Sequence, residues 1–254
     1  MNAVEGVWFP GRMPLRHLLQ REIGRITAPL WMPVATTIMR FGLGYRIEGL
    51  REVRAKYRQI RRQSSAPLLI CANHLTMIDS FLVAWALAPT WRYALRYDEL
   101  PWNTPERRNF AATRWRAFLT YLAKCIPITR GGGFGDAAAV LNRVTQLLRY
   151  GETALIFPEG GRSRTGRVEV ESASWGAGRI AGSLASCRVL CVYLRGRAQE
   201  TWGGKPARGD RISVDIECIE PESDQRGARR SRDFGRQIVE QLVRMERKYF
   251  DGRK

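Results

Sequence analysis

The sequence predicts an α/β fold in which helices flank a mostly parallel sheet, with a basic helical segment on its N-terminal side. Two observations carry this prediction. From residue 66 onward, apolar runs of strand length alternate with longer segments of helical periodicity, which is typical of parallel strands joined by crossover helices. The chain has 254 residues, of which 44% are hydrophobic, so one such domain with an appendage fits its length and composition.

The elements follow from this alternation. Short apolar runs predict strands at 68–72, 91–97, 125–129, 153–157, 189–194 and 212–219. Helical spacing of apolar residues predicts helices at 78–87, 111–123, 136–150, 175–185 and 231–250. In the second of these helices the apolar residues that recur at three and four are Trp115, Phe118, Leu119 and Leu122. Gly151 is the expected stop of the third helix.

The N-terminal part of the chain differs from the rest. The charged stretch 51–65 is the expected boundary between an N-terminal segment, residues 1–62, and an α/β domain, residues 63–254. The segment carries 12 basic and 4 acidic residues, and apolar residues at helical spacing alternate with arginines from Leu15 to Ile26. This pattern predicts a helix that lies in a membrane interface, because no run reaches the roughly 18 apolar residues of a spanning helix. Packing of the segment on the α/β domain is the alternative.

The charge and the metal-ligating residue types narrow the choice of partners. The net charge is +18, so the partners are expected to be anionic: nucleic acid, anionic lipid head groups or a phosphorylated substrate. The five cysteines form no C-x-x-C pair, which predicts reduced thiols in the cytosol. With His17 and His74 as the two histidines, we expect no metal site.

The first motif with catalytic chemistry is Asn73-His74-Leu75-Thr76-Met77-Ile78-Asp79, directly after the strand at 68–72. On one continuous helix His74 and Asp79 would point about 140° apart, so they can meet only across a strand-to-helix turn. There the carboxylate would accept the Nδ1 proton of the histidine and leave Nε2 as a base. The alternative is a loop histidine followed by a helix cap.

Two further motifs follow apolar strands. Phe157 to Gly166 contains Pro158-Glu159-Gly160-Gly161-Arg162-Ser163, in which the glycines permit close approach to a ligand and Arg162 can bind an anion. Arg130 ends the run 126–130. Because ligands of open α/β sheets bind beyond the carboxyl ends of the strands, we expect all three motifs to meet there. An ordinary polar turn is the alternative for 157–166.

In these motifs the chain resembles the glycerolipid and lysophospholipid acyltransferase family, typified by 1-acylglycerol-3-phosphate acyltransferase. The resemblance covers residues 66–196, with blocks at 73–79, 126–130, 157–163 and 189–194. Gly161 stands where the family usually has Thr, and Cys191 stands where it usually has Pro. The stretch 173–176 lacks the aromatic residue and the cation of the family's corresponding segment.

The resemblance implies roles for the motif residues. His74 would be the catalytic base and Asp79 the residue that orients it. The expected substrate-binding residues are Asn73, Arg130, Glu159, Gly160, Gly161, Arg162 and Ser163. Of these, Arg130, Glu159 and Arg162 would shape the site of the acceptor phosphate, and backbone N–H groups near Gly160 and Gly161 are candidates for stabilising the oxyanion.

The resemblance also implies the reaction. A fatty acyl group would move from an acyl thioester to the free hydroxyl of a lysophospholipid, with 1-acylglycerol-3-phosphate as acceptor and phosphatidate as product. No cofactor is expected, since acyl-CoA or acyl carrier protein enters as a co-substrate. The expected location is the cytoplasmic face of a membrane with anionic lipids, as a peripheral or monotopic protein. Another lyso-lipid or hydroxylated amphiphile remains an alternative acceptor. A nucleic-acid-binding protein is the non-enzyme alternative, although no nucleic acid partner is expected because no such motif accompanies the arginines.

Overall fold

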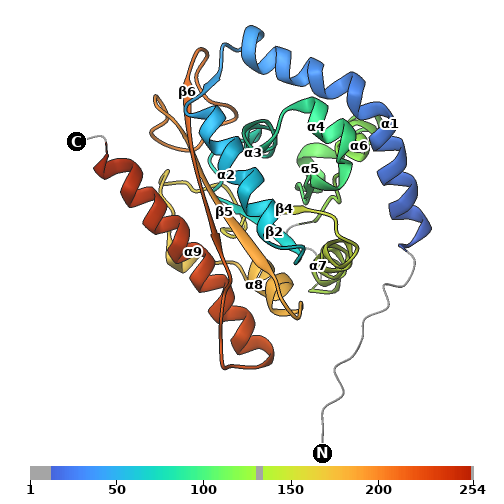
Figure 1. Ribbon diagram of the computed structural model, residues 1–254, viewed down its shortest axis with the longest axis vertical. Helices are drawn as coiled ribbons and strands as arrows, with labels where there is room; N and C mark the ends of the chain where they lie inside the picture. The colour runs from blue at the N-terminus through green and yellow to red at the C-terminus, as the bar shows by residue number, and fades with distance from the viewer. Residues whose placement is uncertain (1–12, 130–133, 253–254) are drawn as a thin grey trace, which may run out of the picture.

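A computed structural model describes residues 13–129 and 134–252 and contains one six-stranded sheet (Figure 1). The strands are β1 (Arg46–Ile47), β2 (Leu68–Ala72), β3 (Trp102–Asn103), β4 (Ala154–Ile156), β5 (Arg188–Gly196) and β6 (Arg211–Ile219). Their order across the sheet is β1-β6-β5-β2-β4-β3, and every neighbouring pair is parallel except β5 with β6. The predicted mostly parallel α/β sheet is therefore confirmed.

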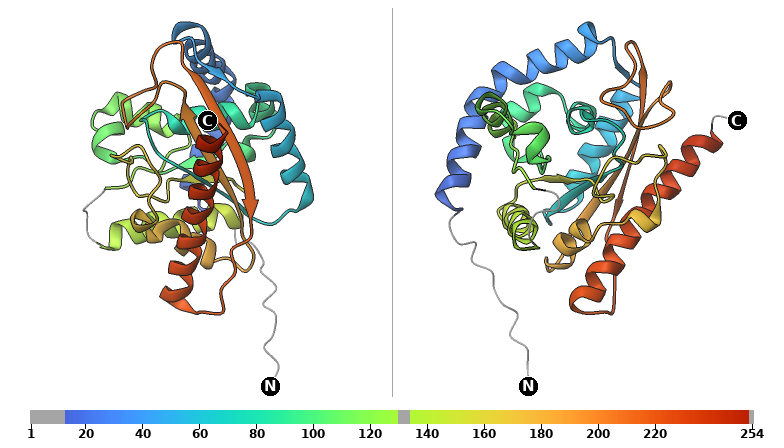
Figure 2. Two further views of the ribbon diagram at one scale, coloured as in Figure 1. Left: turned by 90° about the vertical axis from the view of Figure 1, so that its left-hand side faces the viewer. Right: turned by 180° about the vertical axis from the view of Figure 1, so that it is seen from behind.

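The helices of the described residues cover both faces of this sheet. They are α1 (Leu15–Thr37), α2 (Leu50–Gln63), α3 (Asp79–Leu87), α4 (Thr90–Leu95), α5 (Arg107–Phe110), α6 (Arg114–Leu122), α7 (Phe134–Arg149), α8 (Trp175–Gly182) and α9 (Gly227–Asp251). A π-helical turn, Ile38–Gly42, continues α1, and 3-10 turns occupy Tyr97–Glu99 and Val170–Ser172. Helices α1 and α9 lie on opposite sides of the molecule (Figure 2).

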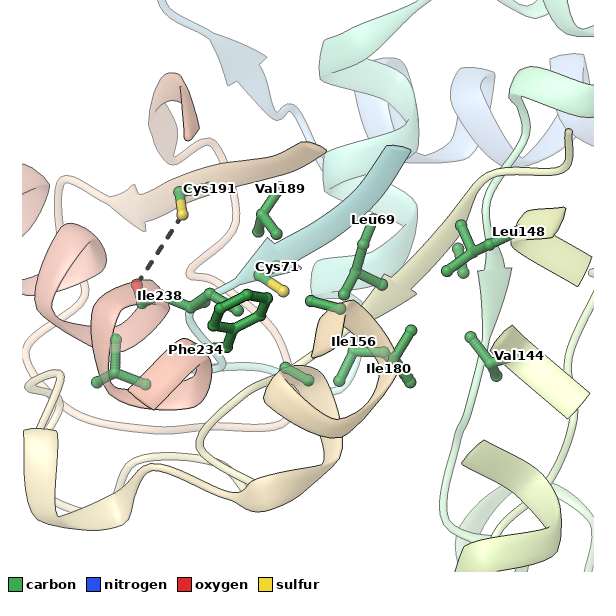
Figure 3. Close-up of a cluster of buried hydrophobic side chains, with 14 of the residues drawn as sticks. Leu69, Cys71, Val144, Leu148, Ile156, Ile180, Val189, Cys191, Phe234 and Ile238 are labelled. Atoms are coloured by element: carbon green, nitrogen blue, oxygen red, sulfur yellow. Dashed lines mark hydrogen bonds between the residues drawn. The ribbon is translucent and has the colours of Figure 1, made fainter. Parts of the chain in front are cut away.

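The central strand β2 is buried along its whole length and contributes to two cores. Leu69 and Cys71 pack with residues of α7, α8 and α9 on one face, while Leu68, Ile70 and Ala72 pack with residues of α2 and α3 on the other. This alternation is the period of two expected for a strand. Figure 3 shows the first core, in which Leu69 and Cys71 lie near Phe234 of α9.

Two of the predicted strands are wrong. Residues 91–97 form α4 and the start of a 3-10 turn, in which Tyr93 is buried while Trp91 and Leu95 are exposed. Pro89 precedes the helix and its carbonyl accepts the first hydrogen bond, from Arg92 N–H. Residues 125–129 make isolated bridges at Cys125 and Ile128 rather than a strand, because Pro127 has no N–H to donate to a ladder.

The charged stretch 51–65 is largely a helix. In α2 the apolar residues Val53, Tyr57 and Ile60 recur at helical spacing and are buried against the sheet. Arg51, Arg58 and Arg62 are exposed. The preceding strand β1 pairs with β6, so residues 46–63 contact the same sheet as the residues that follow. The division of the chain at residue 62 stays a prediction about folding units.

Helix α1 is inverted relative to an ordinary surface helix. Its buried residues are His17, Gln20, Gly24, Ala28 and Met32. Its exposed residues are mostly large and apolar, and with the following π turn they include Leu15, Leu19, Ile23, Ile26, Leu30, Val34, Ile38 and Phe41. Gly24 permits close packing, because a side chain there would collide with Tyr97. Within 13–129 and 134–252, no helix combines the length and hydropathy that a membrane crossing requires.

A buried ionic cluster fastens α1 to the rest of the protein. Lys124 is fully buried and its ammonium lies 2.5 Å from the Glu152 carboxylate. The same carboxylate accepts hydrogen bonds from Arg21 Nε of α1 at 2.6 Å and from Trp102 Nε1 at 2.9 Å. Gln20 donates from α1 to the carbonyls of Tyr121 and Cys125. Polar residues therefore form the inner face of α1.

Candidate active site

The His74–Asp79 contact that the spacing predicts is present. β2 ends at Ala72, His74 lies in the loop that follows, and Asp79 is the first residue of α3. The Nδ1 atom of His74 lies 3.0 Å from Asp79 Oδ2, and the two side chains are 13% and 2% exposed. Because Asp79 holds Nδ1, Nε2 is the nitrogen that remains to accept a proton.

The Asp79 carboxylate is fixed by the loop that it closes. Its Oδ2 accepts hydrogen bonds of 2.7 Å from the N–H groups of Leu75 and Thr76, and its Oδ1 accepts one from the Thr76 hydroxyl. These donors precede the helix, so Asp79 does not cap the first turn of α3 in the usual way. The arrangement sets the rotamer of the carboxylate and with it the plane of the histidine ring.

The motif at 157–166 contacts both the main chain and the side chain of His74. The His74 N–H donates to Glu159 Oε1 at 3.0 Å, and the His74 carbonyl accepts from the Ser163 N–H at 2.9 Å. The imidazole also stacks on Phe157, with ring centroids 3.9 Å apart. The structure therefore brings Glu159 and Ser163 to the backbone of the histidine, whereas their role in substrate binding stays a prediction.

Glu159 is a mostly buried carboxyl in this site. Burial raises its pKa to about 8, the carboxylates of Glu246, Asp79 and Glu169 act in the same direction, and the hydrogen bond from His74 N–H opposes them. In the unfolded chain the group would titrate near 4.5. Between these two values the folded protein retains a proton that the unfolded chain has lost, so this group makes the folded state less stable as the pH rises.

Glu159→Gln should therefore change the pH dependence of stability. The amide oxygen can still accept from His74 N–H but carries no charge at any pH. Relative to the parent protein, we expect the free energy of unfolding of the variant to rise by more than about 1.4 kcal/mol, the equivalent of one pKa unit, between pH 4.5 and pH 8. Urea unfolding of both proteins at the two pH values measures this difference. A constant offset at both values would contradict the raised pKa.

Gly160 lies in a turn that requires a glycine. It has φ +67°, in the left-handed region, and a side chain there would press against Ser174. Its N–H donates to the Phe157 carbonyl at 3.0 Å. This N–H is thus used inside the loop, and the expectation that N–H groups near Gly160 and Gly161 stabilise an oxyanion stays a prediction.

Arg162 reaches the same region and is held in place by a neighbouring loop. Its Nη1 donates to the Gly203 carbonyl at 2.9 Å, and its guanidinium lies 4.6 Å from the ring centre of Trp202. Gly203 in turn donates its N–H to the Leu75 carbonyl, so the loop between β5 and β6 joins both motifs. The remaining N–H groups of the guanidinium stay available for an anion.

Asn73 and Arg130 are placed differently. Asn73 is buried, and its side-chain amide pairs with both the N–H and the carbonyl of Leu194, so it holds β2 against β5. The structure does not direct this side chain toward the cavity described next. Arg130 lies outside the described residues.

A cavity of about 440 Å³ begins at His74 and Arg162 and extends beneath α1. This volume is in the range of small-molecule sites. Its walls are mainly apolar and come from α1, α3, α4 and α6: Trp31, Met32, Met39, Met77, Phe81, Ala84, Trp85, Tyr93 and Leu119. Polar groups also line it: Ser80, Asn103, Thr104, Glu106, Asn109 and Arg116.

Sequence reasoning missed this polar set. Asn103 ends the two-residue strand β3, which is too short to give a pattern, and Thr104 follows it. Arg116 lies on a helix whose face carries no predicted site. The signal that was available is position, because β3 is parallel to β4 and its carboxyl end therefore opens on the same edge of the sheet as the other motifs.

The comparison with known proteins matches the central part of the chain, from β1 to β5. The family model described as Acyltransferase matches residues 45–195, from just before β1 to the last residues of β5. N-acylphosphatidylethanolamine synthase from Arabidopsis thaliana is 29% identical over 143 residues, which make up 53% of this chain and 46% of that protein. The chain thus spans about half the length of this curated relative. The family match includes both motifs that hold His74 and leaves α1 outside.

Proposed function

We propose, because this chain belongs to the acyltransferase family, that it transfers a fatty acyl group from an acyl thioester to the free hydroxyl of a lysophospholipid. The observation that carries the proposal is the His74–Asp79 pair at one end of a large apolar cavity. A base beside an apolar cavity suits a reaction whose substrates have a polar reacting group and a long hydrocarbon chain. The co-substrate would be acyl-CoA or acyl carrier protein.

In the proposed mechanism His74 Nε2 takes the proton of the acceptor hydroxyl as its oxygen bonds to the thioester carbonyl carbon. Asp79 holds the tautomer with Nδ1–H and stabilises the imidazolium that forms. The tetrahedral intermediate then breaks its carbon–sulfur bond, and the thiolate takes the proton back from His74. A thiolate leaves readily, so the pathway needs no covalent acyl-enzyme. The Gly161 N–H is our candidate donor to the oxyanion.

The choice of acceptor rests on Arg162 and its neighbours. A phosphate near the histidine could bind the free N–H groups of this arginine, which supports 1-acylglycerol-3-phosphate as acceptor and phosphatidate as product. A second acceptor class is the amine of a phospholipid, because the curated relative is named as an N-acylphosphatidylethanolamine synthase. Residues 173–176 depart from the family's usual segment, so they do not favour either acceptor class over the other.

One assay tests both the reaction and the acceptor. Purified protein is incubated with acyl-CoA or acyl carrier protein thioester and with a panel of lysophospholipids and phosphatidylethanolamine, and the products are identified by mass. Ester formation on 1-acylglycerol-3-phosphate supports the proposal. Amide formation on phosphatidylethanolamine would assign the second class, and no transfer to any acceptor from either donor would contradict the proposed activity.

Arg162→Lys should raise the KM for the phosphorylated acceptor about tenfold, with a smaller change in the KM for the donor. The lysine keeps the charge but loses the planar, bidentate donor pair and the stacking on Trp202. Initial rates at varied acceptor and donor concentrations measure the two constants. The control is Arg164→Lys, an exposed arginine two residues further along the same loop, which should leave both constants unchanged. An unchanged acceptor KM with reduced thermal stability would show that Arg162 stabilises the loop at Gly203 and does not bind the acceptor.

We infer that α1 holds the enzyme on the cytoplasmic face of a membrane with anionic lipids. Within the part of the chain that the structure describes, its outward leucines and isoleucines are exposed, while residues such as Met32 on its inner face line the cavity. An apolar helix face of this kind, with arginines beside it, suits the boundary between head groups and acyl chains. Both amphiphilic substrates would then be reached from the bilayer.

Replacing Ile26 and Leu30 by Gln should weaken binding to anionic vesicles at least tenfold without unfolding the protein. Both side chains are more than 70% exposed, so the polar amides cost little within the folded state. Co-sedimentation with vesicles measures the binding, and thermal unfolding checks the fold. Leu82→Gln is the control for the thermal unfolding measurement. This residue is buried, so the same kind of replacement should destabilise the core. Unchanged vesicle binding of the folded variant would remove α1 from the membrane contact.

A further inference from the structure

Helix α6 carries its apolar face toward solvent. Trp115, Phe118 and Leu119 recur at three- and four-residue spacing, which usually marks the face that a helix buries in the core. In the structure they are 66%, 50% and 46% exposed. Trp115 and Phe118 lie next to each other, with ring centroids 5.9 Å apart. We call these three residues together the α6 patch.

Arginines surround the α6 patch. Arg107 and Arg108 of α5 and Arg114 and Arg116 of α6 are exposed, and α5 contacts α6. The sequence has no acidic residue from 107 to 135. An exposed aromatic pair with exposed arginines on the same and the adjoining helix is complementary to the interface of an anionic bilayer, where aromatic rings lie at the level of the head groups and arginines bind phosphates.

The α6 patch belongs to a group of helices in contact that all carry exposed apolar residues. Helix α1, whose outward face is apolar, packs against both α4 and α6 (Figure 1). Trp91 and Leu95 of α4 are also exposed. Leu119 of the patch lines the cavity that begins at His74, so the patch lies at the wall of that cavity.

We propose that the α6 patch is a second lipid-contacting surface, in which Trp115 and Phe118 enter the interface of an anionic bilayer and the surrounding arginines bind lipid phosphates. This inference rests on the proposed membrane association. Its evidence, however, comes from residues that are distant in sequence from α1. A second copy of this chain is a poorer occupant. In a twofold dimer the same patch meets itself, which would bring the exposed arginines of α5 and α6 of the two copies close together.

The test compares vesicle binding by matched variants of the full chain. Trp115→Gln with Phe118→Gln should weaken binding to vesicles of equimolar phosphatidylcholine and phosphatidylglycerol about tenfold or more. Trp175→Gln is the control, because this tryptophan is 50% exposed on α8, outside this group of helices, and its loss should leave binding unchanged. Replacing Arg107, Arg108 and Arg114 by Gln should weaken binding to these vesicles much more than binding to phosphatidylcholine alone.

The outcomes separate this surface from the α1 contact and from catalysis. If the Trp115 and Phe118 variant folds and binds as tightly as the parent while the α1 variant does not, the α6 patch is not a lipid contact and the proposal is overturned. If the parent forms a dimer in sedimentation equilibrium that this variant loses, with vesicle binding intact, the patch is a self-association surface and the proposal is again overturned.

Should the double variant unfold, Trp115→Phe gives the test. This variant should still bind vesicles, but brominated lipids should quench less of its tryptophan fluorescence, because the contribution of Trp115 is lost. The same quenching in both proteins would contradict insertion. None of these measurements uses acyl transfer, so failure of the proposed reaction would not affect them.

Discussion

His74→Ala should abolish acyl transfer and leave the fold intact. The imidazole lies at one end of the cavity and is held there by a hydrogen bond to Asp79 and by stacking on Phe157. Removing a positioned general base typically costs roughly 100- to 10,000-fold in rate. The hydrogen bonds that Glu159 and Ser163 make go to the main chain of residue 74, so alanine keeps them. Single-turnover rates with a thioester donor measure the loss, and circular dichroism checks the fold. Turnover near that of the parent in a folded variant would contradict the mechanism.

Asp79→Asn is the companion test, since it separates orientation from folding. The carboxylate accepts from two N–H groups, a hydroxyl and the histidine, and an asparagine nitrogen can accept none of these. We expect lower stability together with a strong fall in turnover, because an amide does not stabilise an imidazolium. A fall in stability alone, with turnover per folded molecule unchanged, would make Asp79 only a loop-closing residue.

Glu152→Ala should cost about 3–5 kcal/mol of unfolding free energy, the largest stability effect we expect from one substitution. The change leaves the fully buried Lys124 ammonium without its counter-ion, and breaking a buried pair on one side has a cost of this order. It also removes acceptors from Trp102 Nε1 and from Arg21 of α1. Burial already lowers the pKa of Lys124 to about 8, so loss of the carboxylate should lower it further. Chemical unfolding at neutral pH measures the loss.

A surface ion pair provides the matched control for this cluster. Lys56 lies 3.3 Å from Glu217, and both side chains are about two-fifths exposed. Glu217→Ala should therefore cost less than about 1 kcal/mol. Adding Lys124→Met to Glu152→Ala should recover part of the loss, because it removes the uncompensated charge. Equal effects of Glu152→Ala and Glu217→Ala would show that the buried carboxylate does not anchor α1.

The sequence was sufficient to predict the central strands of the sheet and the contact between His74 and Asp79. Strand β2 has the predicted bounds, β4, β5 and β6 lie where their apolar runs are, and His74 meets Asp79 across the predicted turn. These features depend on local patterns: a fully buried strand is apolar along its length, and a five-residue spacing allows contact only across a turn. The family resemblance is confirmed by the match over residues 45–195.

The elements at the edge of the sheet and the orientation of helices α1, α4 and α6 were harder to predict. Residues 91–97 have apolar residues at alternate positions, yet most of the segment is a helix that begins after Pro89, in which Tyr93 is buried while Trp91 and Leu95 are exposed. The face of α6 was read correctly as apolar, but periodicity alone does not say whether such a face meets a core or a different apolar medium. The inner face of α1 could not be predicted because its partners, Tyr121, Cys125 and Glu152, are more than 100 residues away in sequence.

The two hydrogen bonds on the main chain of His74 have a further consequence, for local opening. One goes to Glu159 and the other comes from Ser163, so the loop after β2 cannot open without breaking contacts to the loop after β4. The amide protons of His74 and Ser163 should therefore exchange with solvent deuterium at similar rates, as members of one cooperative opening unit. Each opening event would displace His74 and the loop after β4 at the same time. The population of catalytically competent enzyme would therefore follow the free energy of this single local equilibrium rather than that of global unfolding.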